Sequence, residues 1–492
     1  MKNDGYKVVL SSDRTLFSEY HGGIFLGFSA CFPSSLINEF LYFNLFCPSI
    51  EVEESGAAKF ASRSLRLIES KLLEDGFREN EVIVAHPYYL DRVIGSETEI
   101  LGLSEQDPLG WGPATSTFTN IFGGEAYMAK KFHEILEALS VKKNDPHIMV
   151  GGPGSWQLSS KEVREQKGIN SIIVGEAEEI VSDVFRDIIR GNGASDVIEG
   201  EPTNVNQIPT SVGPTLNGIV EISRGCGRGC SFCPLAKVER RDIPIQQIIN
   251  DIKTNCKANR HTPILHAEDV LKYKSHQGVN EEAVLNLFKE IKSLPKVNNV
   301  DISHFSISSV VGSPELIEKI SNLLNLGKNQ SFLGGQVGVE TASPRLIRKH
   351  MKGKLGKNDP EDWPEMVIKA FKVLSKNKWV PAATVLMGLP DERKEDVLKN
   401  IELIDKLKNI RSLIVPLSYV GTENGSSFDL SEAPPYYKEL FKKCWKHNFK
   451  WMESLYRDYS QMYLNGIKSL PTKFVLKFAK HYYRKRLERI LK

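Results

Sequence analysis

Short apolar segments alternate with helical patterns along most of this chain, and this alternation is the strongest constraint on its fold. In the intervening stretches the apolar residues recur every three or four positions, as on one face of a helix. Such alternation favours parallel sheets with crossover helices, here an open Rossmann-like sheet over about residues 70–195, with ligands at the carboxyl ends of its strands. The expected strands cover residues 81–85, 99–103, 147–150 and 171–175, and the expected helices 61–75, 129–139 and 177–190.

A second strand–helix series follows a polar segment, residues 191–214, which contains three prolines and is expected to include a linker. Its six strand–helix units predict a full or partial barrel, with its chemistry at the carboxyl ends of the strands. The expected strands cover residues 218–222, 264–266, 300–302, 336–339, 383–387 and 412–415. From Pro434 onward the pattern is helical. The predicted fold class is α/β: a Rossmann-like sheet, a partial (βα)6 barrel and a C-terminal helical extension.

Composition excludes several classes of protein. Of 492 residues 41% are hydrophobic, and the 37 glycines and 24 prolines follow no period, so fibrous and wholly disordered chains are excluded. The longest uncharged stretch, residues 20–38, contains His21 and Pro33, so we expect buried core there and not a membrane span. No secretory signal is evident at the N-terminus, and we expect a cytoplasmic protein.

The last 22 residues are strongly basic, although the whole chain has a net charge of only +3. Residues 471–492 predict an amphipathic helix with Lys and Arg over much of its surface. Such a helix suits an anionic membrane surface, and the same charges suit RNA phosphates. A solvated helix docked on the protein's own barrel is the plain alternative. Peripheral contact with the inner face of a membrane is therefore one expectation.

Three of the seven cysteines lie within eight residues, directly after a predicted strand. Cys226, Cys230 and Cys233 are separated by three and then two residues, which brings three sulfurs together. Three thiolates leave one iron of a four-iron cluster free to bind a substrate or cofactor. A zinc knuckle is the structural alternative, but no Cys or His follows within twenty residues to supply a fourth ligand.

The pattern Cys226-x-x-x-Cys230-x-Phe232-Cys233 resembles the signature of radical S-adenosylmethionine (SAM) enzymes. The resemblance extends over about residues 215–425. It implies a [4Fe–4S] cluster held by the three cysteines, with SAM bound at the open iron and an external one-electron reductant. It also implies that SAM is cleaved to a 5′-deoxyadenosyl radical that abstracts hydrogen. The protein orients the reactants and excludes water.

The same resemblance implies further cofactor-binding residues. Glu268 falls where the family has a Gly-Gly-Glu segment contacting the methionine amino group, although both glycines are absent here. Glu340 and Ser343 lie in a segment similar to one near the cofactor, for which a helix cap is the alternative interpretation. Gly388 begins a turn that matches a family turn near the adenine, with Asp391 in place of glycine. Phe232 is the aromatic residue of the signature.

The upstream sheet resembles the cobalamin-binding domain that precedes the barrel in many of these enzymes. The resemblance rests on Val150-Gly-Gly-Pro153 and Val174-Gly-Glu-Ala-Glu178. The histidine loop that ligates cobalt in some cobalamin proteins does not occur, and His147 is expected to be an ordinary buried or edge histidine. Cobalamin is therefore an optional cofactor. The expected domains are residues 1–200 (cobalamin-binding-like), 201–214 (linker), 215–430 (radical SAM barrel) and 431–492 (helical, basic).

Several hypotheses for the function follow. Residues 107–119, rich in Gly and hydroxyls, together with 334–338 and 379–384, resemble an archaeal subgroup that includes the tetraether (GDGT) lipid ring synthases. This resemblance implies a hydrophobic lipid substrate and carbon–carbon ring formation. The alternative is a cobalamin-dependent radical SAM methyltransferase acting on a peptide, RNA or small molecule. A nucleic-acid-binding protein with a structural metal is less expected. A methylthiotransferase is also less expected, because only Cys31 and Cys47 precede the main motif.

Overall fold

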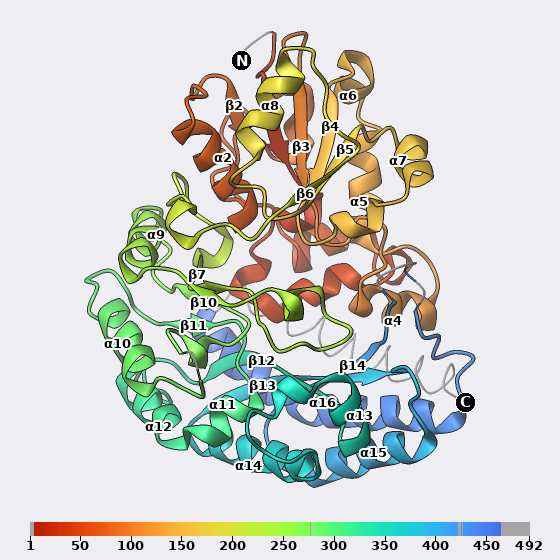
Figure 1. The fold of residues 1–492 in the computed structure, drawn as a ribbon, viewed down its shortest axis with the longest axis vertical. Helices are drawn as coiled ribbons and strands as arrows, with labels where there is room; N and C mark the ends of the chain where they lie inside the picture. The colour runs from red at the N-terminus through yellow and green to blue at the C-terminus, as the bar shows by residue number, and fades with distance from the viewer. Residues whose placement is uncertain (1–3, 276, 422–424, 426, 464–492) are drawn as a thin grey trace. The chain divides into compact units, whose positions relative to one another are not determined.

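The structure, a computed structural model, describes residues 4–275, 277–421, 425 and 427–463 (Figure 1). The described residues form two compact units. The first comprises residues 4–218, 250–259 and 425, and the second comprises residues 219–249, 260–275, 277–421 and 427–463. Each unit combines parallel strands with helices, as the alternation in the sequence predicts.

Six parallel strands form the sheet of the first unit, in the order β2-β1-β3-β4-β5-β6. The strands are β1 (Val8–Ser11), β2 (Val82–Val84), β3 (Ile100–Ser104), β4 (His147–Gly151), β5 (Ser171–Gly175) and β6 (Val197–Gly200). The strand order reverses between β1 and β3, the point at which ligands bind in open sheets of this kind. The predicted Rossmann-like sheet is confirmed. It contains two strands, β1 and β6, that the sequence analysis did not predict.

Two apolar cores cover the faces of this sheet. Successive residues of a strand point to opposite faces, so Val8 and Leu10 belong to one core and Val9 to the other. Helices α2 (Arg63–Glu74) and α8 (Val181–Ile189) pack on the first face. The second face is covered by helices α3 (Leu90–Val93), α5 (Tyr127–Leu136), α6 (Leu139–Asn144) and α7 (Lys161–Lys167). Burial on both faces explains why these strands are almost wholly apolar.

Two segments of the first unit differ from the expectation. Residues 20–38, expected as buried core, form the short 3₁₀ helices η2 (Tyr20–Gly22), η3 (Ile24–Cys31) and η4 (Ser34–Leu36) and are only partly buried. Part of segment 107–119, which has no predicted helix, lies in α4 (Pro113–Phe122). The Asp107 carboxylate accepts hydrogen bonds from Gly112 N–H and Thr115 Oγ1 and so fixes the start of that helix. Helices α1 (Glu39–Leu41) and η5 (Tyr42–Phe46) complete this region.

The second unit contains all six strands predicted for the barrel. Strands β7 (Ile219–Glu221), β10 (Ile264–His266) and β11 (Asp301–Ile302) form one parallel sheet, and β12 (Leu333–Glu340), β13 (Trp379–Met387) and β14 (Leu413–Ser418) form another. A bridge between His304 and Gln336 joins the two sheets. The resulting sequential order is that of a partial (βα)6 barrel, and the predicted fold class is confirmed. A short antiparallel pair, β8 (Ser223–Arg224) and β9 (Arg241–Asp242), lies beside the barrel strands in sequence.

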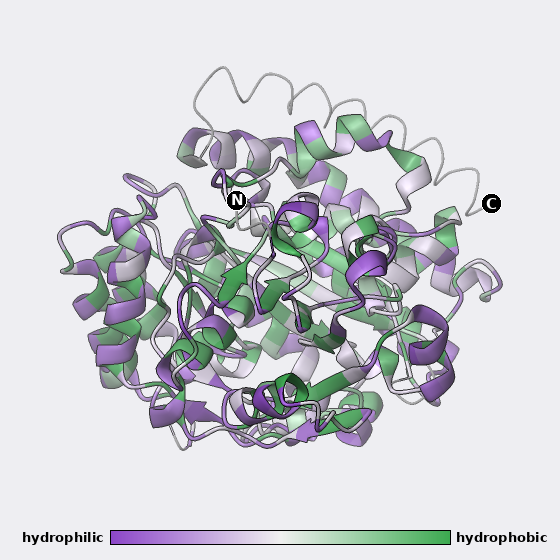
Figure 2. Ribbon diagram, turned by 90° about the horizontal axis from the view of Figure 1, so that it is seen from above, coloured by the Kyte–Doolittle hydropathy of each residue, from purple (hydrophilic) through white to green (hydrophobic). Residues whose placement is uncertain are grey.

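The outer face of the barrel strands is apolar and the helices pack against it. Val220, Leu265 and Ile302 are almost completely buried there. Figure 2 shows visible strands that are green to pale, whereas the helices carry both green and purple residues. The helices are α9 (Ile245–Lys257), α10 (Glu281–Lys292), α11 (Ile307–Gly312), α12 (Pro314–Leu323), α13 (Pro344–His350), α14 (Trp363–Lys376), α15 (Lys394–Leu407) and α16 (Pro435–Tyr463).

Helix α16 is the described part of the predicted C-terminal helical extension. The basic segment 471–492, with its predicted membrane or RNA contacts, lies outside the described residues. Within the part of the chain that the structure describes, every helix is too short or too polar to cross a membrane.

Candidate functional site

The three cysteines of the motif lie on one tight loop between β8 and β9. The loop is held by backbone hydrogen bonds from Cys226 N–H to the Val238 carbonyl (3.0 Å) and from Gly229 N–H to the Ala236 carbonyl (2.9 Å). Gly225 has φ +75°, and a Cβ added there would lie 2.3 Å from the Glu239 carbonyl oxygen. Only glycine fits this position, because other residues would be strained and would collide with the returning chain.

The sulfurs of the loop share one electrostatic environment. Cys230 is buried, and Cys226 and Cys233 are partly exposed. Burial raises the pKa of the Cys230 and Cys233 thiols, and neighbouring thiolates raise the pKa further, whereas the ammonium of Lys354 lowers that of Cys230. Metal binding would remove these protons, because thiolates are the ligands. Three thiols on one loop suit a cluster that takes three protein ligands.

The zinc alternative gains no support from the geometry. Among the described residues no group of three or more His, Cys, Asp or Glu side chains is arranged to hold a single metal ion. A structural zinc site needs four such ligands at one point. A four-iron cluster instead has its irons spread over a cube and tolerates sulfur ligands that do not converge on a single ion.

A buried ion pair fixes the cysteine loop to the barrel. Arg228, between the first two cysteines, donates to the Asp269 carboxylate, and Asp269 is 2% exposed. The same carboxylate oxygen accepts from Ser306 Oγ (2.6 Å) and Ser309 Oγ (2.8 Å). Asp269 follows β10, and the two serines begin α11. Since all four groups are partnered, the loop has one preferred position on the barrel.

His350 gives the loop a second attachment, at the end of α13. Ser231 N–H donates to the His350 carbonyl (2.9 Å), and the Ser231 hydroxyl lies 2.9 Å from His350 Nδ1. His350 Nε2 lies 3.1 Å from the Pro390 carbonyl. Because a carbonyl only accepts, Nε2 is the donor nitrogen, so in a neutral imidazole Nδ1 accepts from Ser231. The loop is thereby tied to the turn that follows β13.

Glu340 ends β12 near the cysteine loop and is 7% exposed. Its carboxylate accepts from Lys354 Nζ (2.6 Å) and from Thr384 Oγ1 (2.9 Å). Its φ is +63°, which is uncommon for a residue other than glycine. The charges of Glu340 and Lys354 both act on the pKa of Cys230.

The other predicted cofactor residues lie at different places around the loop. Glu268 is half-buried, and its charge raises the pKa of Cys233. Phe232 is half-buried on the loop itself. Ser343 is fully buried, caps α13 by accepting from Leu346 N–H and donates to Asp396 Oδ1 (2.5 Å). Contacts of these residues with a cofactor stay predictions.

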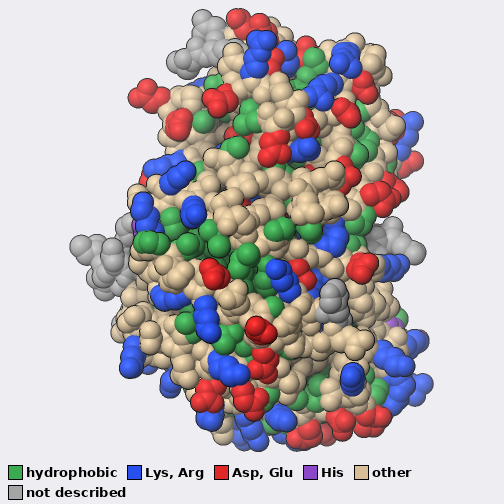
Figure 3. All heavy atoms as spheres, turned by 60° about the vertical axis from the view of Figure 1, so that its left-hand side comes forward, with side chains coloured by type: hydrophobic (Ala, Val, Ile, Leu, Met, Phe, Trp, Pro, Cys, Tyr) green, Lys and Arg blue, Asp and Glu red, His purple; other side chains and the backbone are tan. Residues whose placement is uncertain are grey.

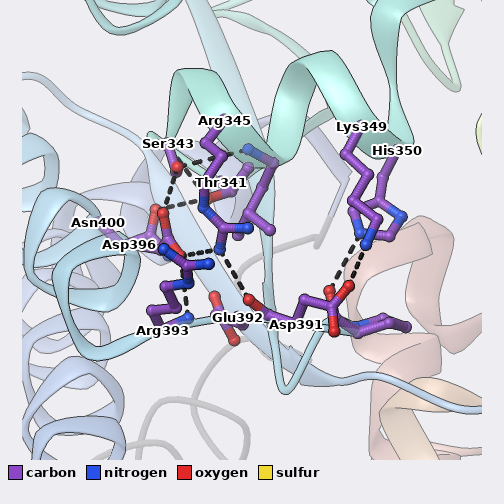
Figure 4. A network of polar contacts seen from close by, with 12 residues as sticks. Thr341, Ser343, Arg345, Lys349, His350, Asp391, Glu392, Arg393, Asp396 and Asn400 are labelled. Atoms are coloured by element: carbon purple, nitrogen blue, oxygen red, sulfur yellow. Dashed lines mark hydrogen bonds and ion pairs between the residues drawn. The ribbon is translucent and has the colours of Figure 1, made fainter.

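The turn after β13 is shaped by Gly388 and Asp391, which both have positive φ, +79° and +62°. Asp391 occupies the backbone conformation that glycine adopts readily, and this explains how it replaces a glycine of the family pattern. Gly388 N–H donates to Glu392 Oε2 (2.6 Å), which also accepts from Tyr437 Oη (3.0 Å). Burial raises the pKa of Glu392 to about 7. Figure 4 shows how Arg345 and Lys349 of α13 reach this turn.

Sequence reasoning missed four residues that organise the site. Asp269 directly follows Glu268, but only Glu268 was predicted to bind the cofactor. Asp269 is the more deeply buried of the two residues. The other three have no motif to mark them, because their partners come from distant parts of the chain. They are Lys354, His350 and Tyr437.

Carboxyl groups gather at the switch point of the first unit, at the carboxyl ends of β1 and β3. Asp13 and Glu105 are each 1% exposed, and Asp13 N–H donates to Glu105 Oε1 (2.9 Å). Burial raises the pKa of Asp13 to about 6 and that of Glu105 well above its ordinary value. His147 opens β4 and therefore lies at the amino end of the sheet, where its Nε2 contacts Ser171 Oγ (2.7 Å). His147 therefore lies at the amino ends of the strands, opposite the carboxyl ends where ligands bind.

The comparisons with known proteins agree with this geometry. Residues 220–404 match the model of the radical SAM superfamily. The tRNA-2-methylthio-N(6)-dimethylallyladenosine synthase of Shewanella sp. (strain W3-18-1) is 21% identical over 291 residues, 58% of each chain. The corresponding synthase of Vesicomyosocius okutanii subsp. Calyptogena okutanii is 19% identical over 290 residues, 56% of this chain and 61% of its own. The chain thus spans about three fifths of the length of these relatives.

A solved structure with a similar fold is the radical SAM methyltransferase TsrM from Kitasatospora setae. With tryptophan substrate and a SAM analogue bound it superposes with a TM-score of 0.53, at 14% identity, over 85% of this chain and 75% of its own. With cobalamin and a [4Fe–4S] cluster bound it gives a TM-score of 0.54 at 13% identity, over 85% of this chain and 73% of its own. These likenesses concern the fold.

The radical SAM enzyme is confirmed at the level of its domain, together with the cluster and SAM that the superfamily uses. The resemblance to the archaeal tetraether lipid ring synthases is not supported by these relatives. The match to the family model begins in β7 and ends in α15, so it includes the cysteine loop, Glu340 and the Gly388 turn. Residues 220–404 of this chain are therefore a domain of the radical SAM superfamily.

Proposed function

We propose that this chain is a radical SAM enzyme that transfers a methyl group to an unactivated carbon with the help of cobalamin. When bound, the reduced cluster supplies the electron that splits SAM into methionine and a hydrogen-abstracting carbon radical, and cobalamin carries the methyl group. The chain's own residues hold and orient these groups. The observation that carries the proposal is the loop of Cys226, Cys230 and Cys233, tied to the barrel by Arg228 and Asp269.

The residues around the loop provide the polar contacts that SAM needs. SAM carries an amino group, a carboxylate and a sulfonium, so its site requires both negative and positive partners. Glu340 and Glu268 offer carboxylates, and Lys354 offers an ammonium. Gly388 lies against the ring of Phe428, which an added Cβ would meet at 2.2 Å, and its contact with the adenine stays a prediction. Exclusion of water by the barrel would protect the radical from side reactions.

The edge of the first unit fits cobalamin held without a histidine ligand. In residues 4–218, His147 lies at the opposite edge. His86, which follows β2 at the carboxyl edge, is 1% exposed and has both ring nitrogens engaged: Nδ1 accepts from Tyr88 N–H (3.2 Å) and Nε2 lies 3.0 Å from Ser49 Oγ. Asp13, one of the carboxyls at the switch point, has a buried oxygen, Oδ2, without a hydrogen-bond partner. Such an acceptor suits the amide side chains of a corrin ring.

Methylthio transfer, the reaction named for the tRNA-modifying relatives, is a weaker candidate. It needs a second cluster held by three upstream cysteines, whereas only Cys31 and Cys47 precede the main motif. Burial raises the pKa of both thiols, that of Cys31 to about 12. Lipid ring formation stays a prediction without support from the relatives. In Figure 3 basic and acidic side chains are interspersed over the visible face, which does not favour a phosphate-binding surface there.

The test is anaerobic reconstitution of the full chain with iron, sulfide and hydroxocobalamin, followed by reduction with dithionite in the presence of SAM. We expect about four irons per chain, formation of 5′-deoxyadenosine, and about one retained cobalamin. Cys230→Ala should lose the iron and the 5′-deoxyadenosine, and Cys444→Ala, which changes a buried cysteine of α16, should keep both. Zinc in place of iron would refute the radical chemistry. Absence of cobalamin would refute the methyl transfer and leave the radical SAM assignment standing.

A further inference from the structure

A polar patch lines the inner face of the barrel next to the cysteine loop. None of its residues is among those assigned above to holding the cluster or its loop. The patch consists of Glu221, His266, His304 and Gln336. Glu221 and His266 are paired across β7 and β10, so their side chains share one face. Their neighbours on the opposite face, Val220 and Leu265, are fully buried among the helices. The inner face at these strand ends is therefore polar.

The two histidines are in contact. Their ring centroids lie 5.9 Å apart, with the ring planes at 73°. His304 pairs with Gln336 in the bridge that joins the two sheets, and the Gln336 side chain acts to raise the pKa of His304. Burial lowers the pKa of both imidazoles, so both are neutral near pH 7. A neutral imidazole offers one donor and one acceptor, which suits recognition of a polar ligand.

The patch contains two buried acceptors without a hydrogen-bond partner. They are His304 Nδ1 and Glu221 Oε2. The other oxygen of Glu221 accepts from Arg224 Nε (2.9 Å), so the side chain is fixed with its second oxygen unused. An apolar ligand would leave both acceptors unpaired, whereas a ligand with N–H or O–H groups would satisfy them.

The patch also lies near the cysteine loop. Glu221 of the patch accepts a hydrogen bond from Arg224 Nε (2.9 Å), and Arg224 lies two residues before Cys226 at the start of the loop. A ligand held by the histidines would therefore lie beside the place where SAM is cleaved in the proposed reaction.

We infer that His266, His304 and Glu221 bind the substrate, and that this substrate is a polar molecule that presents an N–H group to His304 Nδ1. The inference rests on the proposed function, since it names the substrate class of the same site. It argues against a hydrocarbon chain as the reacting group, because a hydrocarbon would bury the two acceptors unpaired. His266 supports the ring of His304 at its edge and is a positioning residue.

The experiment uses the reconstituted full chain with SAM present and measures the binding of three probes, indole, benzimidazole and adenine, by ligand-observed NMR. Each probe is compared with its N-methylated form, which lacks the donor. We expect at least one N–H probe to bind about tenfold more tightly than its methylated partner. His304→Phe should abolish this preference. His304→Asn, which keeps a polar atom near the position of Nδ1, should restore part of it.

His261→Phe is the matched control. His261 precedes β10 and also has a buried Nδ1 without a partner, but it lies at the amino end of the strand. This variant should keep the preference. Equal binding of each pair, failure of all three N–H probes, or an unchanged preference in His304→Phe would overturn the inference. Formation of 5′-deoxyadenosine, measured on the same samples without probe, reports on the proposed function separately. A loss of SAM binding in His304→Phe would assign the patch to SAM and also overturn the inference.

Discussion

Arg228 and Asp269 form a buried ion pair that joins the cysteine loop to the carboxyl end of β10. The two residues are 41 positions apart in the chain, and their side chains are 11% and 3% exposed. Arg228 comes from the middle of the motif, so any displacement of this pair displaces the three sulfurs. Because Ser306 and Ser309 donate to the same oxygen, the Asp269 side chain is held in one orientation. The ion pair then fixes the position of the cysteine loop.

Replacing Asp269 by Ala should release the cysteine loop. Removing one partner of a buried pair costs about 3–5 kcal/mol, since the other charge is left uncompensated. We expect iron content after reconstitution to fall by at least about half and the electron paramagnetic resonance signal of the reduced cluster to broaden. Asp405→Ala is the control, because Asp405 forms an exposed ion pair with Lys443 worth about 0–1 kcal/mol. An unaltered signal in Asp269→Ala would show that the pair does not position the loop.

Gly225→Ala tests the turn that opens the cysteine loop. The new Cβ would meet the Glu239 carbonyl at 2.3 Å and would strain a φ of +75°. We expect a loss of about 2 kcal/mol or more in the free energy of unfolding and reduced iron content. Gly229→Ala is the matched control on the same loop: it has a similar φ of +67°, but a Cβ there meets nothing within 4 Å. Comparable losses in both variants would mean that strain alone, without the collision, explains the effect.

The partner of Glu340 offers a test of SAM binding. Lys354→Met removes the ammonium from a carboxylate that is 7% exposed and is predicted to contact the cofactor. We expect the Kd for SAM, measured by equilibrium dialysis, to rise about tenfold or more, because a charge-assisted hydrogen bond is lost beside the cofactor. Lys406→Met, which changes an exposed lysine of α15, should leave the Kd unchanged. If both variants bind SAM like the unmodified chain, Glu340 and Lys354 serve only the fold.

The strands that could be predicted from the sequence differ physically from the two that could not. The barrel strands are apolar runs bounded by polar turns, so each could be recognised locally. Strand β6 was not predicted because Val197 and Glu199 are exposed at the edge of the sheet and the segment lies in a polar stretch. Strand β1 was not predicted because its three apolar residues, Val8 to Leu10, stand alone near the N-terminus without a preceding helix.

The residues of the candidate site also fall into those that could be predicted from the sequence and those that could not. The cysteines could be predicted because three ligands lie within eight residues, and this spacing by itself indicates a metal or cluster site. Asp269, Lys354 and Tyr437 could not, since each is 14 to 45 residues from its partner and meets it only through the barrel's topology. A polar residue is recognised as part of a site only when its partner is known.

Glu392 predicts a pH dependence of stability. Burial raises its pKa from an ordinary value of 4.5 to about 7, and the Tyr437 hydroxyl donates to its Oε2 at 3.0 Å. Because the folded chain keeps this proton to a higher pH than the unfolded chain, folding takes up a proton between about pH 4.5 and 7. The free energy of unfolding should therefore fall as pH rises through that window, by at most about 3 kcal/mol from this group.

Glu392→Gln isolates this contribution, because glutamine keeps the size of the side chain and never ionises. We expect its thermal midpoint, measured by calorimetry at several pH values, to fall less than that of the unmodified chain between pH 5 and 7.5. Tyr437→Phe removes a hydrogen bond that favours the ionised form, so it should steepen the fall. Tyr436→Phe, a change at the neighbouring tyrosine of α16, controls for general effects on the helix. Parallel pH profiles of the unmodified chain and Glu392→Gln would mean that Glu392 is already ionised in the folded protein at neutral pH, contrary to its burial.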